Sequence, residues 1–307
     1  MKAVVTGGAG FIGAQLGGAL LRDGHEVIVV DDLSTGVAEH VPPGAEFFKG
    51  CITDAELLRT AFAGADVVLH HAARRAVAQS VEDPIETDRI NTSGTLRVLV
   101  AAKDAGVRRV ILASSSSVYG GGDGSPSRET DPPRPQSPYA ASKLAGEQYG
   151  RVFHQLFGLE TVILRYFNVY GPGQRPDAPY AAVVPLFIRA LLSDQTPVIE
   201  GDGLQSRDFT FIEDVVAANL LALQAPANVV AGQTYNIARG QATSVLELMQ
   251  ELCRITQRPF APSYAPPRPG DVHRSLADVS NASHAFNFRA HTGVLEGLAA
   301  TVQACRH

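Results

Sequence analysis

The sequence predicts an α/β fold, in which a doubly wound parallel sheet is covered by helices on both faces. Short apolar runs alternate with helical stretches through the first half of the chain. These runs are apolar throughout instead of alternating with polar residues, which is typical of parallel strands buried on both faces. Gly7, Gly10 and Gly13 separate the first strand from the first helix, as in the tight strand-to-helix turns of this fold class.

The predicted elements follow in a regular order. Strands are expected over 2–6, 26–30, 46–48, 66–70, 109–113 and 161–165, and helices from the glycine turn to about Gly24 and over roughly 88–106 and 138–157. Asp54 can cap the helix after the third strand by accepting a hydrogen bond from its free N–H groups. The glycine turn, His70 and His71, the serines at 114–117 and the segment 166–168 all follow strand ends. Since ligands of such sheets bind beyond the carboxyl ends of the strands, we expect these residues at one edge.

Composition excludes several classes of protein. The chain has 307 residues, 45% of them hydrophobic, and its formal net charge of −5 gives no electrostatic reason to bind nucleic acid or an anionic membrane. We expect neither a signal peptide nor a membrane span. Cys51, Cys253 and Cys305 are far apart, which suits a reducing compartment and a cytoplasmic protein. His70 and His71 lack a third ligand at a sensible spacing, so no metal site is expected.

The glycine turn and the end of the second strand predict a dinucleotide site. A glycine-rich turn lets the backbone approach a pyrophosphate, and the following helix offers free N–H groups and the positive end of its dipole. Asp31 and Asp32 follow about 20 residues later, where a ribose-binding carboxylate is expected. A carboxylate there repels a 2′-phosphate, and Leu33 to Gly36 offer no arginine to reverse that preference. The sequence therefore predicts a Rossmann-like domain that binds NAD in preference to NADP.

Tyr139 and Lys143 form a candidate acid–base pair. Four residues apart on a helix, their side chains lie on one face, one turn apart. An ammonium held near the phenol is expected to lower the tyrosine pKa from its usual value of about 10. A hydroxyl from the run Ser114–Ser117 can share the proton, so the three groups can remove a proton from an alcohol.

After about Asn168 the chain becomes rich in loop-forming residues. The breaker-rich stretches 171–177 and 201–209 alternate with helices expected over 179–193, 243–256 and 291–304. We expect a Rossmann domain of residues 1–167 plus about 209–237, and a smaller, interleaved substrate lobe of about 168–208 plus 238–307. Arg207 and Arg268 lie in expected loops of the second lobe, where each is either a phosphate ligand or a surface residue.

The whole chain resembles the extended short-chain dehydrogenase/reductases, and among them the nucleotide-sugar 4-epimerases. The resemblance rests on Thr6-Gly-Gly-Ala-Gly-Phe-Ile-Gly13, Asp31-Asp-Leu33, His71-Ala-Ala73, Asn91, Ser114–Gly120, Tyr139 with Lys143, Leu164–Pro172, Arg207-Asp-Phe209 and Arg268–Val272. It implies tightly bound NAD that is regenerated in each turnover, a UDP-sugar substrate and a homodimer formed through the helices near 88–106 and 138–157. It also implies Tyr139 as base, Ser115 as helper hydroxyl and Lys143 on the nicotinamide ribose.

The resemblance further implies two sets of binding residues. The cofactor set is Gly7, Gly10, Phe11, Ile12, Gly13, Asp31, Asp32, Ser34, Thr35, Gly36, Cys51, Ile52, His71, Ala72, Ala73, Asn91, Ala113, Ser114, Tyr139, Lys143 and Tyr166. The substrate set is Ser115, Ser116, Ser117, Tyr139, Phe167, Asn168, Arg175, Val183, Arg207, Arg268 and Asp271. Of these, Asn168, Arg207 and Arg268 are expected on the diphosphate.

Departures from the family pattern help to choose a branch. Ser116 and Ser117 stand where dehydratases of the family have an Asp-Glu pair that eliminates water. Cys51 stands where an aspartate commonly meets the adenine, and Glu200 stands where an aromatic residue often precedes Gly-Asp-Gly. Arg175 matches the position at which glucuronate epimerases bind the sugar carboxylate, whereas its alternative role is to pair with Asp177 within the loop.

We therefore predict an NAD-dependent UDP-sugar 4-epimerase that acts through a transient 4-keto sugar, with UDP-glucuronate as the first candidate substrate. Asn168 follows the glucose pattern, so UDP-glucose and UDP-N-acetylglucosamine remain open as substrates. A nucleotide-sugar dehydratase or oxidoreductase is a second hypothesis, and a non-catalytic NAD-sensing protein on the same fold is a third.

Overall fold

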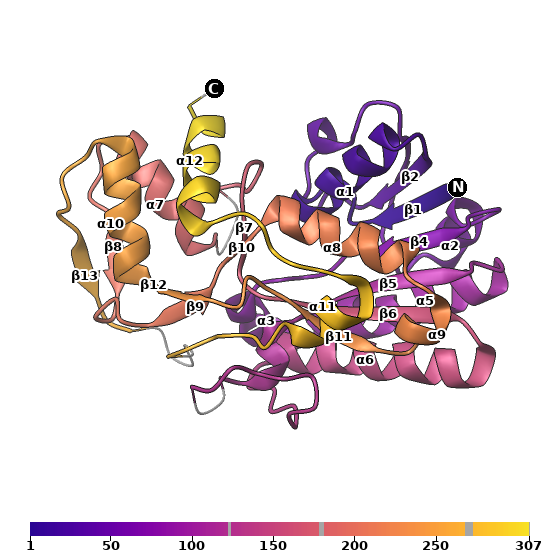
Figure 1. The fold of residues 1–307 in the computed structure, drawn as a ribbon. Helices are drawn as coiled ribbons and strands as arrows, with labels where there is room; N and C mark the ends of the chain where they lie inside the picture. Colours follow the sequence, from indigo (N-terminus) through magenta and orange to yellow (C-terminus); the bar gives the residue numbers. More distant parts are fainter. Residues whose placement is uncertain (122–123, 178–180, 268–272, 307) are drawn as a thin grey trace.

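Figure 1 shows the computed structural model of the chain, which describes residues 1–121, 124–177, 181–267 and 273–306. A seven-stranded sheet forms the centre of the larger lobe, in the order β11-β6-β5-β4-β1-β2-β3. All neighbouring strands in it are parallel, which confirms the predicted doubly wound sheet. The strands are β1 (Lys2–Thr6), β2 (Glu26–Asp31), β3 (Glu46–Lys49), β4 (Val67–His70), β5 (Arg109–Ser115), β6 (Glu160–Tyr166) and β11 (Thr234–Ile237).

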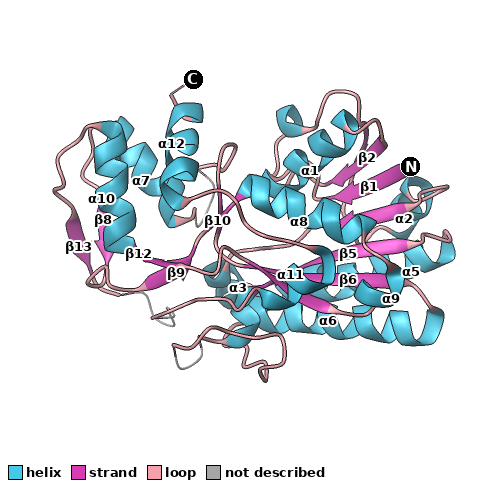
Figure 2. Ribbon diagram, viewed as in Figure 1, coloured by secondary structure: helices cyan, strands magenta, loops and turns pink. Residues whose placement is uncertain are grey.

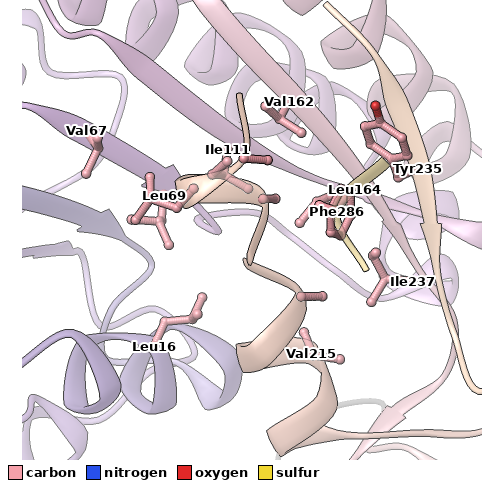
Figure 3. Packing of buried hydrophobic residues seen from close by; sticks show 14 of the residues in the cluster. Leu16, Val67, Leu69, Ile111, Val162, Leu164, Val215, Tyr235, Ile237 and Phe286 are labelled. Atoms are coloured by element: carbon pink, nitrogen blue, oxygen red, sulfur yellow. The ribbon is translucent and has the colours of Figure 1, made fainter. Parts of the chain in front are cut away.

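Helices cover both faces of this sheet (Figure 2). One face packs against α1 (Phe11–Arg22), α8 (Ile212–Gln224), α9 (Ala227–Val230) and α11 (Ser280–Phe286), and the other against α2 (Ala55–Ala61), α5 (Thr95–Asp104) and α6 (Pro138–Phe157). In the first layer, Leu16 of α1, Val215 of α8 and Phe286 of α11 pack with apolar strand residues (Figure 3). Asp54 caps α2 as predicted, because its side chain accepts hydrogen bonds from the N–H groups of Glu56 and Leu57.

The sheet reverses its direction of winding at β1. From β1 the chain passes to β2 and β3 on one side and then returns to β4 on the other side of β1. At such a point the connections lead away in opposite directions and leave a crevice at the carboxyl ends of the strands. Thr6 and His70, the last residues of β1 and β4, are paired in register at this crevice.

A smaller lobe lies beside the sheet, on the left of Figure 1. Its core contains side chains of α7 (Val183–Leu192), α10 (Val245–Thr256) and α12 (Val294–Ala304). Its short strands pair as β7 (Val169–Tyr170) with β10 (Thr210–Phe211), β8 (Val198–Glu200) with β13 (Ser263–Ala265), and β9 (Ser206–Asp208) with β12 (Ala242–Ser244). The lobe therefore begins next to the carboxyl edge of the large sheet, directly after β6.

Several elements differ from the sequence expectation. The helix expected over 88–106 is divided into α4 (Pro84–Asp88), a π-helical turn (Arg89–Gly94) and α5, and it is preceded by an unpredicted α3 (Val77–Glu82). The stretch 201–209, predicted as a loop, contains β9, so Arg207 stands on a strand. The division into lobes remains a prediction, and α11, which it assigns to the second lobe, packs on the large sheet.

Among the described residues, no helix combines the length and the apolar character that crossing a membrane requires.

Candidate active site

A cavity of about 380 Å³ lies at the carboxyl edge of the large sheet. Most of the predicted cofactor residues line it, namely Gly7, Gly10, Phe11, Ile12, Gly13, Asp31, Asp32, Ser34, Thr35, Cys51, Ile52, His71, Ala72, Ala73, Ala113, Ser114, Tyr139, Lys143 and Tyr166. The chain thus brings together residues from the ends of β1, β2, β3, β4, β5 and β6, as the order of the elements predicts.

The glycine turn between β1 and α1 leaves its backbone open to the cavity. Gly7 has a φ of +71°, and a Cβ atom there would lie 2.6 Å from the Ala72 nitrogen. A Cβ atom on Gly13 would lie 2.2 Å from the Gly7 carbonyl oxygen, so only glycine permits this close packing. Gly10 precedes α1 without any side-chain cap. The N–H groups of the first turn are therefore available to an anion.

Asp31 connects the glycine turn with the loop after β2. Its Oδ2 accepts a hydrogen bond from the Ala9 N–H at 3.0 Å, and its Oδ1 accepts one from the Leu33 N–H at 2.8 Å. Burial raises the pKa of this carboxyl, and the two backbone hydrogen bonds oppose the rise. Each oxygen keeps a further lone pair, so the carboxylate can accept hydrogen bonds from ribose hydroxyls. The uncapped glycine cradle and this carboxylate together fit NAD.

Tyr139 and Lys143 stand one turn apart near the start of α6 and both line the cavity. The helix begins at Pro138, and the hydroxyl of the preceding Ser137 accepts the Ala140 N–H at 3.1 Å. Lys143 donates from Nζ to the Ala113 carbonyl at 2.9 Å. Burial lowers the pKa of the Lys143 ammonium to about 8, against the opposing influence of Glu147.

The predicted lowering of the Tyr139 pKa is not what the structure gives. Tyr139 is buried, and burial raises its pKa above the usual value of a phenol. The Ser115 hydroxyl and the Arg75 guanidinium act in the opposite direction. The sequence identifies the Tyr–Lys spacing, but it does not show that burial dominates the pKa of Tyr139. It also misses Arg75.

His71 is held in one tautomer by a chain of hydrogen bonds. Asn219 donates from Nδ2 to the Val215 carbonyl, so its Oδ1 is the acceptor for the Tyr166 hydroxyl at 3.0 Å. The Tyr166 oxygen must then accept the hydrogen of His71 Nε2, 2.9 Å away. Burial lowers the pKa of His71 to about 3 and keeps it neutral. The Leu69 carbonyl opposes this fall of the pKa, and His71 borders the cavity.

Other predicted residues lie outside the cavity lining. The Ser115 and Ser117 hydroxyl oxygens lie 3.0 Å apart, Ser115 accepts the Ser117 N–H at 3.1 Å, and Ser116 belongs to the same 3₁₀ turn. Asn91 bonds both ends of its amide to the Arg74 backbone, at 2.8 and 2.9 Å. A Cβ atom on Gly36 would touch the Ala9 carbonyl.

The predicted substrate residues after β6 stand at the junction of the lobes. Phe167 is buried against Tyr119, and Asn168 donates to the Asp208 carbonyl at 3.4 Å. Arg207 donates to its neighbour's carbonyl, and Val183 is the first residue of α7. Arg268 and Asp271 lie outside the described residues. The substrate roles of all these residues remain predictions.

Arg175 lines the cavity but is already paired. Its Nη2 lies 2.7 Å from Asp177 Oδ2, and its Nε lies 3.1 Å from Oδ1 of the same carboxylate. This pair, with a further contribution from Glu39, raises the pKa of the guanidinium. The structure thus shows the loop pairing that was the alternative to a role in binding a sugar carboxylate.

Sequence reasoning misses one wall of the cavity. The missed residues are Arg74, Arg75, Gln79, Glu86 and Ile90, with Ala9, Val30, His40, Gly50, Gly173 and Gln174 elsewhere in the lining. Those of the missed wall come from the segment after β4, which carries no recognisable motif. The position of Arg74 and Arg75, a few residues beyond a strand end, is the one local signal that could have identified them.

The parallel sheet, the glycine cradle, Asp31 and the facing Tyr–Lys pair define a dinucleotide-dependent enzyme with a group able to move the proton of an alcohol. A model of the NAD dependent epimerase/dehydratase family matches residues 3–238. The chain belongs to this family.

Three comparisons illustrate its neighbours. It is 41% identical to a UDP-glucose 4-epimerase of Mycolicibacterium smegmatis, with 100% of this chain and 99% of that protein covered. It is 32% identical to a UDP-glucuronate 4-epimerase of Thermodesulfobacterium geofontis, with 97% and 94% covered. The crystal structure of a Thermotoga maritima UDP-glucose 4-epimerase with UDP-glucose superposes with a TM-score of 0.96 at 37% identity, covering 100% of this chain and 99% of that one.

Proposed function

We propose that this enzyme is an NAD-dependent 4-epimerase of UDP-sugars that acts through a transient 4-keto sugar, with UDP-glucose and UDP-galactose as its substrates. The observation that carries the reaction is the cavity that Tyr139 and Lys143 share with the glycine turn and Asp31. Bound NAD would supply a reversible hydride acceptor for the sugar carbon. Because no net oxidation takes place, a cofactor that stays in the cradle serves every turnover.

The residues around Tyr139 prepare it to accept and return the proton of the 4-hydroxyl. Burial removes water from its phenol and raises its pKa. The Ser115 hydroxyl and the Arg75 guanidinium oppose this rise, because they stabilise the phenolate. Lys143, held at the Ala113 carbonyl, is placed to bind a ribose hydroxyl beside the phenol. His71 and Tyr166 also line the cavity. Both are neutral at neutral pH, so neither competes with Tyr139 as an acid. We therefore assign the transfer of the 4-hydroxyl proton to Tyr139.

The choice of sugar depends on Arg175. The uronate-binding role predicted for Arg175 would need its guanidinium to be free, and it is bonded through two nitrogens to Asp177. This favours a neutral sugar, in agreement with the substrate named for the 41% identical relative. UDP-glucuronate is the second candidate, because Arg175 lines the cavity and an exposed ion pair exchanges partners at little cost.

Proton NMR of the purified protein with each UDP-sugar, without added NAD, tests both the epimerase reaction and the choice of sugar. We expect UDP-glucose to be epimerised, and Tyr139→Phe to lower the rate by about 10²- to 10⁴-fold, the usual contribution of an acid–base group. Arg175→Ala should leave UDP-glucose conversion nearly unchanged. Conversion of UDP-glucuronate alone, lost in Arg175→Ala, would establish the uronate as the substrate. Release of NADH or of a persistent keto sugar would contradict the epimerase.

We also propose that two copies associate through the outer surface of α3, α4, α5 and α6. Apolar side chains of these helices are exposed, with Val81 64%, Ile85 82%, Leu156 70% and Phe157 52% accessible. A second copy of this chain would bury this surface, here named the α6 face.

A further inference from the structure

One end of the cavity lies beyond β2 and β3, past Asp31. Gly50, Cys51 and Ile52 enter it from the end of β3, and Glu86 and Ile90 enter it from α4 and the π-helical turn. In this sheet the glycine turn faces the pyrophosphate and the carboxylate after β2 faces the ribose. The end beyond β3 would therefore receive the adenine of NAD.

Apolar side chains form the floor of this end. Ile52 is 3% exposed and Ile90 8% exposed, and both belong to the core between the sheet and α5. Two aliphatic side chains can contact the face of a purine, but they do not distinguish one purine from another. Discrimination requires a polar group at the edge of the ring.

A connected set of polar side chains forms that edge. The Thr53 hydroxyl donates to the Cys51 sulfur at 3.2 Å and accepts from Arg89 Nη1 at 3.0 Å. Arg89 in turn donates from Nε and Nη2 to the two oxygens of Glu86, at 2.6 and 2.7 Å. Cys51 and Glu86 are the members of this set that line the cavity.

The two lining groups differ in what they can accept. A thiol sulfur is a weak acceptor, whereas each carboxylate oxygen has two lone pairs. Arg89 uses one lone pair on each Glu86 oxygen and fixes the side chain, which is 35% exposed. The remaining lone pairs can accept N–H groups. The adenine ring carries such a donor, its 6-amino group, on the edge away from the ribose.

We propose that Glu86, held by Arg89, recognises the 6-amino group of the NAD adenine and makes the site selective for adenine over 6-oxopurines. This inference concerns the cofactor and holds whichever sugar is the substrate. A 6-oxo group presents an acceptor to the carboxylate, so the hydrogen bond at position 6 is lost, and the N1–H of a 6-oxopurine stands at a different position on the ring edge.

Competition between NAD and nicotinamide hypoxanthine dinucleotide tests this assignment. The full-length protein is first freed of the dinucleotide with which it is purified and then equilibrated with an equal mixture of both. The dinucleotide that it retains is measured by mass spectrometry. We expect a preference for NAD of about tenfold or more, as one hydrogen bond to a charged group provides. In Glu86→Gln the preference should fall towards one, since the amide can donate to the 6-oxo group.

Matched variants make the result specific. Glu56→Gln removes an equivalent pair with Arg59 on α2, away from the cavity, and should keep the wild-type preference. Cys51→Asp in the Glu86→Gln background places a carboxylate on the same edge and should restore it. An unchanged preference in Glu86→Gln, or no preference in the wild type, would overturn the proposal. The readout is retention of cofactor, so it is independent of epimerase activity.

Discussion

At the scale of single residues, the Lys143 ammonium is exposed to two opposing influences. Burial lowers its pKa to about 8, and Glu147 acts to raise it. The group therefore loses its proton as the pH rises through about 8, well below the value of about 10.4 for a free lysine. Lys143 is thus mostly charged at neutral pH and mostly neutral above the midpoint, so the number of hydrogens that it can donate changes over this range.

NMR of the protein with ¹³C-methylated lysines measures this titration directly. The signal that is missing in Lys143→Arg identifies the residue, and its midpoint should lie near pH 8. Burial of the folded site causes the shift, so unfolding in urea should move the midpoint up towards about 10. A midpoint of about 10 in the folded protein would show that water reaches the site and would contradict the burial of this lysine.

The residues of the site separate into those that a local pattern predicts and those that it does not. Tyr139, Lys143, Asp31 and the glycines stand at spacings set by one helix or one strand–turn–helix unit, so the sequence is sufficient to predict them. Arg75 approaches Tyr139 only through tertiary folding. The direction of the Tyr139 pKa shift likewise depends on burial, which no local pattern records.

At the scale of elements, α6 carries more than the Tyr–Lys pair. Glu147 stands one further turn along and is fully buried, with Arg165 of β6 donating to its two oxygens at 2.8 and 2.7 Å. Ser114, at the end of β5, donates to the same carboxylate at 2.6 Å. The Arg165 guanidinium lies 4.7 Å from the centre of the Tyr119 ring. Glu147 therefore fixes α6 to the two strands whose ends bear the site.

Glu147→Gln should destabilise the protein by about 3 kcal/mol, because it leaves a buried guanidinium without its counter-charge. Urea unfolding measures this loss, and Glu56→Gln, which breaks an exposed pair on α2, should cost at most about 1 kcal/mol. The variant at Glu147 should also lower the Lys143 pKa further, since Glu147 raises it. Equal effects of the two substitutions on stability would contradict a structural role for Glu147.

Elements formed by sequence-local patterns are predicted well, and elements formed by distant pairing are not. α6 and the apolar strands match the expectation because their periodicity or burial is continuous in the sequence. β9 consists of Ser206–Asp208 and forms through pairing with β12, so its own three residues carry no strand signal. The π-helical turn has the periodicity of an ordinary helix, so no local pattern predicts it. Asn91 within this turn bonds to the Arg74 backbone, which is a tertiary contact that the sequence does not show.

At the scale of the whole molecule, the buried carboxylate of Asp208 helps to join the lobes. Asp208 at the end of β9 accepts N–H groups from Arg239 and Gly240, both at 3.0 Å, and from Ala277 at 3.2 Å. These partners follow β11 and precede α11, which are elements of the large sheet and its cover. The second lobe is thereby fixed next to the carboxyl edge, where a substrate must meet the cofactor. The position of the second lobe depends on these hydrogen bonds of Asp208 as well as on the chain segments that connect the two lobes.

The α6 face predicts the assembly of the protein. Leu156 and Phe157 at the end of α6 are exposed, although Phe157 packs against Phe153 at 5.1 Å between ring centres. Burying such side chains against a second copy is favourable by about 25 cal/mol per Å² of apolar surface.

We expect a dimer in analytical ultracentrifugation and a monomer for Leu156→Arg, because the new charge would be buried without a partner. Leu204→Arg, at a leucine 57% exposed in the second lobe, is the matched control and should remain dimeric. A monomeric wild type would contradict the proposed dimer, and dissociation by Leu204→Arg instead would place the association elsewhere on the molecule.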